Sequence, residues 1–373
     1  MISPLRRRRP AKVSSAPAPP TVDLNPESVV AALFDSLLGR APDDQMAAYV
    51  QLLEAAGVAG VTRHLIGSDE FRARAPDAYA VKLPDLSTLM PERYRKGGGD
   101  SLIYEARDAE GLRLMERMIV EHRYYDSFVA WHPVIDLDKR VTAAVIRCLG
   151  AGSVLELGCF AGSVLKLLDD AGVAVTGVEI SHRAFLVAHP SIYHRIRFGD
   201  LLALDLPPEG FDAFLAMDIL EHLNPLDLDA YVARIAQLIG PQGFAYVNSP
   251  MFGEDDVFGQ VFQQYLPAWR EAGPDVFWTQ LHCDAQGWPA HGHLVWAAPQ
   301  WWEALFARHG RVRDREAERL IQARLAEFFA VRAPARKSLF VLRPVGAEPL
   351  ALDQVEARMR DILDPLLVDP TAP

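Results

Sequence analysis

Between residues 153 and 342 the hydrophobic positions fall into seven short runs, separated by stretches with helical spacing. The runs are Ser153–Leu157, Ala174–Glu179, Arg195–Phe198, Ala213–Met217, Phe244–Asn248, Val312–Arg315 and Ser338–Leu342. Apolar runs of this length are typical of strands buried on both faces, and their alternation with helices favours parallel pairing. The pattern predicts an α/β domain over residues 151–346, with a seven-stranded, mostly parallel sheet and helices on both faces.

The N-terminal part of the chain has a purely helical pattern. Asn25 followed by Pro26 is a favourable helix start, because asparagine caps the helix and proline fits its first turn. Further hydrophobic positions predict helices over Ala47–Ala56 and Val61–Ile66 and a helix start at Ser68. We therefore expect a small all-α domain over residues 23–80, preceded by a disordered tail over residues 1–22.

Three other segments complete the predicted organisation. Prolines and the Gly97–Gly99 run indicate a linker over residues 81–100. A helical lead-in over residues 101–150 follows, with helices at Ser101–His122 and Asp138–Leu149. Residues 251–298 form an aromatic-rich insertion that we expect to be a lid or acceptor region, with a small lid core or a dimer contact as the alternative. Residues 347–373 form a C-terminal helix and tail.

Composition excludes several classes of protein. The 373 residues carry 38 basic and 49 acidic side chains, a net charge of −11, which argues against a nucleic-acid partner. No apolar run is long enough to cross a bilayer, and the start of the chain is not a signal peptide, so we expect no membrane insertion. Three scattered cysteines favour a reducing, cytoplasmic location.

The segment Val154–Gly162 predicts a strand, a glycine turn and a helix start, which together suit a nucleoside-bearing cofactor. A P-loop is excluded because no lysine follows Gly162. A dinucleotide is disfavoured because Phe160 stands where a second glycine would admit the pyrophosphate, and Glu156 would repel phosphate. A phosphate-free cofactor that carries an amine fits this carboxylate better.

Four segments in order, Val154–Gly162, Val175–Glu179, Phe198–Leu201 and Phe211–Leu223, resemble the class I S-adenosylmethionine-dependent methyltransferases. The likeness is strongest to the branch with an Asp-x-Leu-Glu-His-Leu motif, which includes many small-molecule and sugar O-methyltransferases. It implies a Rossmann-like domain and S-adenosylmethionine as cofactor. By matching position, it implies a cofactor site made of Glu156, Gly158, Cys159, Phe160, Gly162, Glu179, Ile180, Asp200, Leu201 and Met217. The departure is Phe160, which replaces the middle glycine of the family's turn.

The candidate catalytic residues are His222, His291 and Asp218. Asp218 would line the floor where the cofactor meets the acceptor. For His222 the alternatives are a base or orienter of the acceptor and a structural cap of the next helix. His291 is either a site residue or a loop histidine held by tryptophans.

A metal site is a further alternative. The cluster His282, Cys283, Asp284, His291 and His293 contains metal-ligating residue types. Its spacing fits no standard zinc pattern, and magnesium prefers oxygen ligands. We therefore assign no metal ligand, and magnesium stays an alternative.

The N-terminal segment resembles an uncharacterised bacterial helical module that often accompanies polysaccharide-related enzymes. The matching motifs are Leu38–Asp43 and Ser68–Phe71. Together the resemblances favour methylation of a sugar hydroxyl on a glycan, nucleotide-sugar or glycosylated natural product. The alternatives are an O- or N-methyltransferase of a non-sugar metabolite, and a non-catalytic scaffold. The expected partner is a small-molecule or glycan acceptor, with a homodimer left open.

Overall fold

The structure of the chain is a computed structural model. It describes residues 25–43, 45–74, 89–96, 99–106, 108–121, 134–181, 184, 187–261, 273, 275–284 and 287–368. The predicted disordered tail over residues 1–22 and parts of the predicted linker and insertion lie outside the described residues.

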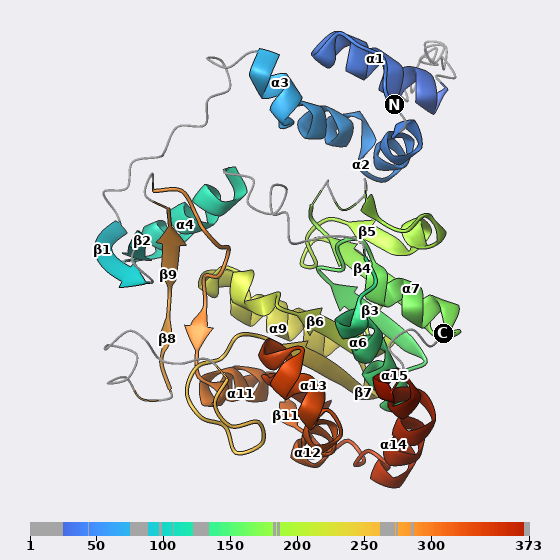
Figure 1. Ribbon diagram of the computed structural model, residues 1–373, viewed down its shortest axis with the longest axis vertical. Helices are drawn as coiled ribbons and strands as arrows, with labels where there is room; N and C mark the ends of the chain where they lie inside the picture. The colour runs from blue at the N-terminus through green and yellow to red at the C-terminus, as the bar shows by residue number, and fades with distance from the viewer. Residues whose placement is uncertain are drawn as a thin grey trace, which may run out of the picture.

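A seven-stranded sheet forms the centre of the molecule (Figure 1). Its strands are β3 (Ser153–Leu157), β4 (Ala174–Glu179), β5 (Ile196–Phe198), β6 (Phe211–Met217), β7 (Ile239–Asn248), β11 (Arg311–Arg313) and β12 (Leu339–Pro344). The spatial order is β11-β12-β7-β6-β3-β4-β5, and β12 runs antiparallel to both of its neighbours while β7, β6, β3, β4 and β5 pair in parallel. The predicted fold class is confirmed, and every predicted strand is present.

Helices cover both faces of the sheet, so alternate residues of each strand enter two separate cores. Val154 packs in the core under α6 (Leu137–Cys148) and α7 (Ser163–Asp170). The next residue, Leu155, packs on the other face under α9 (Pro225–Leu238) and α11 (Pro299–Arg308). Burial on both faces explains why these strands are apolar throughout rather than alternating.

The C-terminal segment adds helices to the face covered by α6. They are α12 (Arg315–Arg324), α13 (Ala326–Val331), α14 (Leu352–Arg358), the π-helical turn η4 (Met359–Leu363) and α15 (Asp364–Val368). Buried Val355, Met359 and Leu363 anchor the last three elements in this core. Arg358 also donates a hydrogen bond to the carbonyl of Cys148, at 2.6 Å. The predicted C-terminal helix is confirmed, and it packs on the sheet domain.

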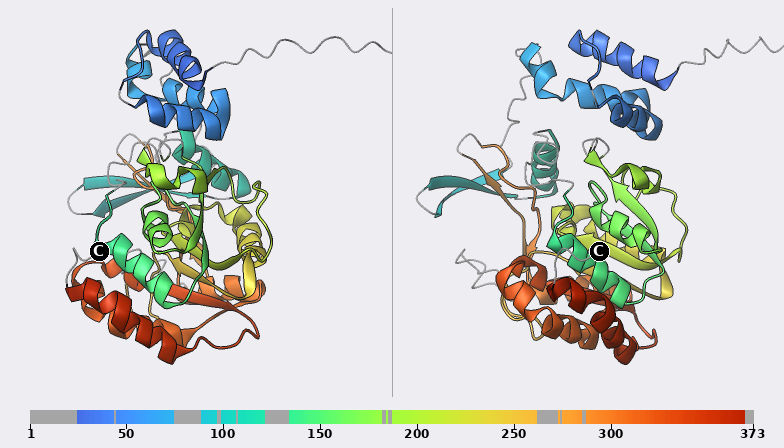
Figure 2. Two further views of the ribbon diagram at one scale, coloured as in Figure 1. Left: turned by 90° about the vertical axis from the view of Figure 1, so that its right-hand side faces the viewer. Right: turned by 45° about the vertical axis from the view of Figure 1, so that its right-hand side comes forward.

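Three N-terminal helices, α1 (Pro26–Leu38), α2 (Met46–Ile66) and α3 (Asp69–Arg74), lie together at one end of the molecule (Figure 2). Asn25 caps α1 as predicted, accepting a hydrogen bond from the Glu27 amide. The two helices expected over residues 47–66 are present within α2, where they are separated by a kink at the non-helical Gly57, whose φ is +67°. Arg40 and Glu70 from the two module motifs form a bidentate ion pair, with distances of 2.8 and 2.7 Å.

The prediction of a linker and a helix over residues 81–122 is wrong in part. Strands β1 (Leu89–Lys96) and β2 (Gly99–Ala106) form an antiparallel hairpin, and helix α4 (Ala109–Glu121) begins only after it. β2 also pairs with β9 (Gln280–Cys283), from the insertion. Ile103 and Tyr104 are buried, so tertiary pairing with a strand some 180 residues away along the chain overrides the local helical pattern.

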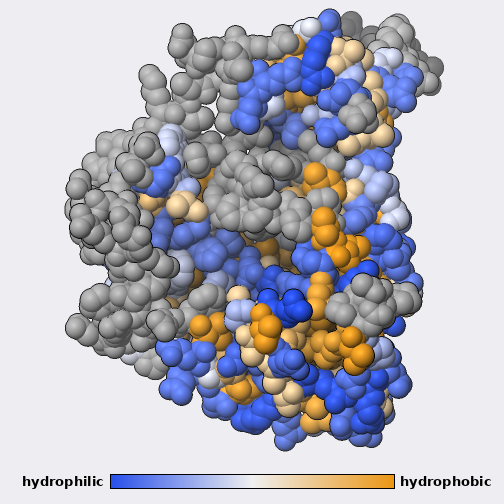
Figure 3. All heavy atoms as spheres, viewed as in Figure 1, coloured by the Kyte–Doolittle hydropathy of each residue, from blue (hydrophilic) through white to orange (hydrophobic). Residues whose placement is uncertain are grey.

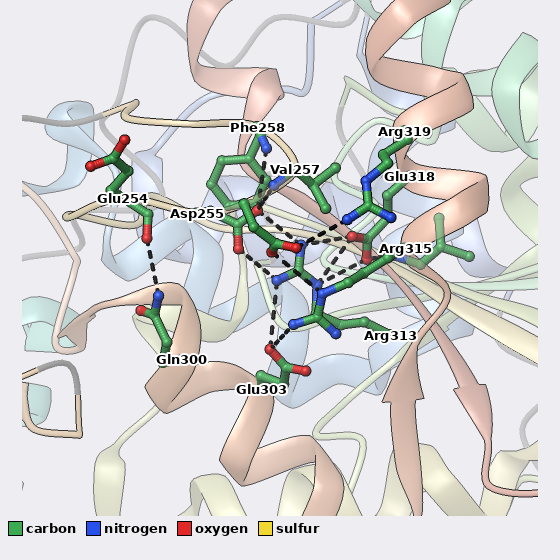
Figure 4. A network of polar contacts seen from close by, with 12 residues as sticks. Glu254, Asp255, Val257, Phe258, Gln300, Glu303, Arg313, Arg315, Glu318 and Arg319 are labelled. Carbon is green, nitrogen blue, oxygen red and sulfur yellow. Dashed lines mark hydrogen bonds and ion pairs between the residues drawn. The ribbon is translucent and has the colours of Figure 1, made fainter.

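A buried polar network joins the loop after β7 to β11 and α12 (Figure 4). The guanidinium of Arg313 donates to Asp255 at 2.6 and 3.1 Å and to Glu318 at 2.7 to 3.2 Å. All three side chains are at most 2% exposed. Phe340 packs its ring 4.2 Å from the same guanidinium. The network therefore holds one cation between two carboxylates and ties the antiparallel edge of the sheet to its helices.

On the face shown in Figure 3, hydrophilic and hydrophobic residues are interspersed over the described surface. Among the helices that the structure describes, none combines the length and the apolar character that crossing a membrane requires.

Candidate active site

A pocket opens at the carboxyl ends of the parallel strands, where ligands bind in open α/β sheets. The turns after β3, β4, β5 and β6 form its floor, and α4 and α9 form further walls. Its lining residues are Glu116, Ile119, Val120, Leu157, Gly158, Phe160, Val178, Glu179, Ile180, Ser181, Asp200, Leu201, Ile219, His222, Leu223, Asn224, Tyr231 and Leu294. The lining combines apolar side chains with a few acidic and backbone groups, which is the composition typical of sites for small ligands.

The glycine turn after β3 brings bare backbone to the pocket. At Gly158, where φ is +68°, an added Cβ would lie 2.2 Å from a side-chain carbon of Ile219, so no other residue fits without movement. Phe160 also has positive φ, +46°, although it carries a side chain. Its backbone amide donates to Glu179 at 2.8 Å. The phenylalanine thus adopts the conformation that the family's usual glycine would adopt without strain.

Glu179 is fixed at the end of β4. One carboxylate oxygen accepts from the amides of Ile180 and Ser181, both at 2.8 Å, and the other accepts from Phe160. A carboxylate has lone pairs beyond these bonds, so the group can also receive ribose hydroxyls from the pocket side. The adjacent Ile180 is 55% exposed, and it gives this part of the pocket an apolar wall.

Asp200 lies across the pocket from this turn, after β5. It accepts hydrogen bonds from the amide of Leu202 at 2.8 Å and from the hydroxyl of Tyr231 at 2.9 Å. Burial, and then the hydrogen bond to Asp200, raise the pKa of Tyr231, so the phenol stays a donor. The pair orients a carboxylate toward the position that the resemblance gives to adenine.

Glu156, the last acid before the glycine turn, is buried and does not line the pocket. Burial, together with the nearby Glu179, raises its pKa to about 8. Within the described residues, its Oε2 atom has no hydrogen-bond partner. An amine close to this carboxyl group would lower its pKa and supply a positive partner.

Asp218 has a protein partner of its own. Its carboxylate pairs with Arg336, which also bonds Asp138 and the side-chain oxygen of Asn248. Asp218 also has a positive φ of +54° and does not line the pocket. The ion pair explains the position of the Asp218 carboxylate without any role in catalysis. A catalytic role for Asp218 therefore stays a prediction.

His222, which lines the pocket, belongs to a cluster with Glu221 and His293. The backbone carbonyl of Glu221 accepts from the amides of Leu294 at 2.7 Å and Val295 at 2.9 Å. This pairing places His293, some 70 residues later, beside the turn η2 (Leu220–His222), with the two imidazole centroids 4.6 Å apart. The insertion thus supplies a side chain to the site.

Burial sets the protonation of the histidines. It lowers the pKa of His222 to about 3, helped by His293, while a hydrogen bond to the backbone of Gly292 opposes the shift. It lowers the pKa of His293 to about 4 and that of His291 below its ordinary value. General-base catalysis favours a pKa near the working pH. For His222 the low value favours orienting the acceptor over removing its proton.

His291 does not line the pocket, although its ring centroid lies 5.1 Å from that of His293. Its Nδ1 atom accepts the backbone amide of His293 at 3.1 Å, so the neutral ring carries its proton on Nε2. Trp296 packs against the same ring with centroids 5.3 Å apart. The tryptophan contact that we expected for a loop histidine is present.

The structure brings six of the ten predicted cofactor residues into the pocket lining: Gly158, Phe160, Glu179, Ile180, Asp200 and Leu201. The other four, Glu156, Cys159, Gly162 and Met217, lie outside the lining. Sequence reasoning missed the wall formed by α4, and it missed Tyr231 and Leu294. A helical position such as Tyr231 carries no local signal, whereas the neighbouring histidines mark the segment of Leu294.

Comparisons with known proteins agree with this geometry. Residues 154–243 match a family model described as a methyltransferase domain. A ubiquinone biosynthesis O-methyltransferase of Bradyrhizobium diazoefficiens is 31% identical over 111 residues, which are 28% of this chain and 42% of that protein. The chain spans 42 to 63% of the length of the first three curated relatives that it matches.

Among solved structures, the 1,6-didemethyltoxoflavin-N1-methyltransferase of Burkholderia thailandensis aligns over 68% of this chain and 99% of its own, at 18% identity and a TM-score of 0.41. An amino pentose methyltransferase from Micromonospora echinaspora covers 61% and 97%, at 19% identity and a TM-score of 0.37.

Another curated relative, an uncharacterized methyltransferase of Geobacillus thermodenitrificans, is 30% identical over 153 residues, which are 39% of this chain and 71% of that protein. The chain therefore belongs to the S-adenosylmethionine-dependent methyltransferases.

Proposed function

We propose that the chain transfers the methyl group of S-adenosylmethionine to a hydroxyl of a small acceptor, of which a sugar is the first candidate. The observation that carries the proposal is a set of acidic side chains at the ends of the parallel strands: Glu179 and Asp200 line the pocket, and Glu156 is buried in β3 just before the glycine turn. Glu179 would face the ribose and Asp200 the adenine, and the buried Glu156 has an oxygen without a hydrogen-bond partner among the described residues. Three carboxylates would repel a pyrophosphate but suit a cationic nucleoside.

When bound, S-adenosylmethionine supplies a methyl group activated on a sulfonium. The protein then has to align the acceptor, because oriented reactants alone can lower the barrier by about 7–11 kcal/mol. Ile180 would cover the base of the cofactor and Glu179 would hold its ribose. His222 would contact the acceptor, since it is the imidazole in the pocket lining. Helix α4 contributes Ile119 and Val120 to the lining of the pocket.

A sugar acceptor is supported by the aromatic residues beside His222. Trp296 lies 5.2 Å from the His293 ring and 5.6 Å from the His282 ring, measured between centroids. Flat indole and imidazole faces with nearby polar atoms suit the alternating apolar and hydroxylated faces of a carbohydrate. The N-terminal segment at residues 23–80, which resembles a module that often accompanies polysaccharide-related enzymes, also favours such an acceptor.

A second candidate acceptor is a hydroxyl on a non-sugar metabolite. It is favoured by the curated relatives that are named ubiquinone biosynthesis O-methyltransferases. The indole of Trp296 and the imidazoles beside it could also stack against an aromatic ring of the acceptor. Turnover assays with nucleotide-sugars, glycan fragments and phenolic metabolites, in parallel and with one cofactor concentration, separate the two candidates.

The cofactor assignment is tested by calorimetry with S-adenosylmethionine and S-adenosylhomocysteine. Loss of the Glu179 carboxylate in Glu179→Ala removes the acceptor for the ribose, and we expect affinity to fall about 10- to 100-fold. Glu316→Ala, an exposed acid on α12, is the matched control and should bind normally. Unchanged binding by Glu179→Ala would overturn the assignment of this pocket.

A further inference from the structure

The carboxylate of Glu221 is buried, and its two oxygens differ in their hydrogen bonding. The side chain is 0% exposed, and its Oε2 atom accepts from the hydroxyl of Ser249 at 2.8 Å. Its Oε1 atom is also buried and, among the residues that the structure describes, has no hydrogen-bond partner. A buried carboxylate without a partner is unfavourable, so this atom indicates a missing cation or a bound proton.

Two imidazole nitrogens face the unpartnered oxygen. The Nε2 atom of His222 lies 3.9 Å from Glu221 Oε1, and the Nε2 atom of His293 lies 4.0 Å from it. The ligating atoms of the three residues all lie within 4.8 Å of one another. Ligand atoms about 2.1 Å from one tetrahedral ion lie about 3.4 Å apart, so the three groups would have to move closer to one another to share an ion.

The protein fixes each of these groups from behind. Ser249 orients the carboxylate, a hydrogen bond to the backbone of Gly292 orients His222, and the amides of Leu294 and Val295 hold the His293 segment against Glu221. Partners of this kind, which orient ligands without touching the ion, accompany metal sites in proteins.

We propose that Glu221, His222 and His293 bind one divalent transition-metal ion at the wall of the pocket. The set of two imidazoles and one carboxylate suits Zn²⁺, Co²⁺, Fe²⁺ or Mn²⁺ and leaves coordination positions open. His222 and Leu294 line the pocket, so the open positions face the space for the acceptor. Magnesium, the alternative left by the sequence, is less suited because it prefers oxygen ligands.

This site differs from the ligand set that the sequence suggested. His293 belongs to both sets, whereas Glu221 and His222 come from the turn after β6. Cys283 is buried, and burial raises the pKa of its thiol to about 12, so the thiolate needed for metal binding is disfavoured. His291 presents its protonated Nε2 and is not a ligand in this arrangement.

The chemical consequence rests on the proposed function. An acceptor hydroxyl bound to the ion becomes a stronger acid, and its O–H proton leaves to water. The oxygen lone pair then forms the C–O bond as the C–S bond of the sulfonium breaks. The products are the methyl ether, S-adenosylhomocysteine and one proton. In this reaction His222 would act as a ligand of the ion rather than as a base.

The test is Co²⁺ and Zn²⁺ binding by the full-length chain after chelator treatment, measured by calorimetry and by the visible absorption of bound Co²⁺. We expect one ion per chain in the unaltered protein and in the control His194→Ala, whose histidine is exposed. Glu221→Gln and His293→Ala should each weaken binding by at least about tenfold. Circular dichroism verifies that each variant is folded, and having two variants keeps the test valid if one of them is not.

Two results would overturn the proposal. One is the absence of a stoichiometric ion, which would mean that Glu221 is protonated instead. The other is equal Co²⁺ binding by His293→Ala and the unaltered chain, which would place the ion elsewhere. Parallel titration with S-adenosylhomocysteine separates this inference from the proposed function: cofactor binding without ion binding rejects the metal site alone, and ion binding without cofactor binding rejects the cofactor pocket alone.

Discussion

Two buried groups of charges in this molecule differ in how they are neutralised. In the network of Figure 4, Arg313 lies between Asp255 and Glu318, and each carboxylate bonds the guanidinium directly. At the carboxyl edge of the sheet, Glu221 and Glu156 each have a buried oxygen for which the described residues supply no partner. The first group is complete in itself, so it is structural. The second is satisfied either by bound protons or by a cation, and the proposed ligands would supply the cation.

The largest expected effect comes from removing the cation of the complete network. Arg313→Met would leave Asp255 and Glu318 buried without their partner, and we expect a loss of about 3–5 kcal/mol in the free energy of unfolding. Urea denaturation measures it. Arg319→Ala, an arginine that is 54% exposed, is the control and should change stability by less than about 1 kcal/mol. A small effect of Arg313→Met would remove the contrast between the two groups.

Neutralising Glu221 should have a small effect on stability and a large effect on turnover. Glu221→Gln replaces a carboxyl group that lacks a cation with a neutral group of the same shape, and burial already raises the pKa of Glu221. In metal-free protein we expect the free energy of unfolding to fall by no more than about 1 kcal/mol. Turnover should fall at least about 100-fold. Destabilisation like that of Arg313→Met would show that Glu221 is structural.

Glu156 allows a pH-dependent test of the buried carboxyl groups at the carboxyl edge of the sheet. Its pKa is about 8 when folded and near 4.5 when unfolded, so the folded chain holds the proton more tightly. Stability should therefore fall as the pH rises from about 4.5 to about 8, and should vary little with this group outside that window. Urea denaturation at several pH values, compared with Glu156→Gln, measures this contribution.

Cofactor binding should also reverse the protonation of Glu156. An ammonium near the carboxyl group stabilises its charged form, so S-adenosylmethionine should displace up to about one proton at pH 7. Calorimetry in buffers of different ionisation enthalpy measures this release. Glu156→Gln should abolish it, and equal release by that variant would show that the proton comes from another group.

The smallest expected effect is at Phe160. Its positive φ is unfavourable by about 1–2 kcal/mol, so Phe160→Gly should relieve strain while it removes an apolar contact with the ligand. We expect nearly unchanged stability and a change in cofactor affinity of less than about tenfold. Thermal unfolding and calorimetry measure both. A complete loss of binding would show that the aromatic ring itself holds the ligand.

The sequence predicted the sheet well because its strands are buried on both faces and bounded by glycine turns. β3 and β4 begin and end at the predicted residues. The prediction from sequence failed at β2, because the pairing of β2 with β9 is a long-range interaction that no local pattern encodes. The same limit applies to the site: Glu179 and Asp200 follow strands and were found, whereas Tyr231 and the α4 wall depend on how distant helices pack.

The central claim is that the pocket and the Glu221 cluster form one site that needs a cationic cofactor and a metal ion. Anomalous scattering from crystals grown with Co²⁺ and S-adenosylhomocysteine tests it most directly. The account predicts one cobalt peak bound by Glu221, His222 and His293, with the nucleoside beside Glu179 and Asp200. A cobalt peak only at exposed histidines, or a nucleoside bound outside this pocket, would contradict it.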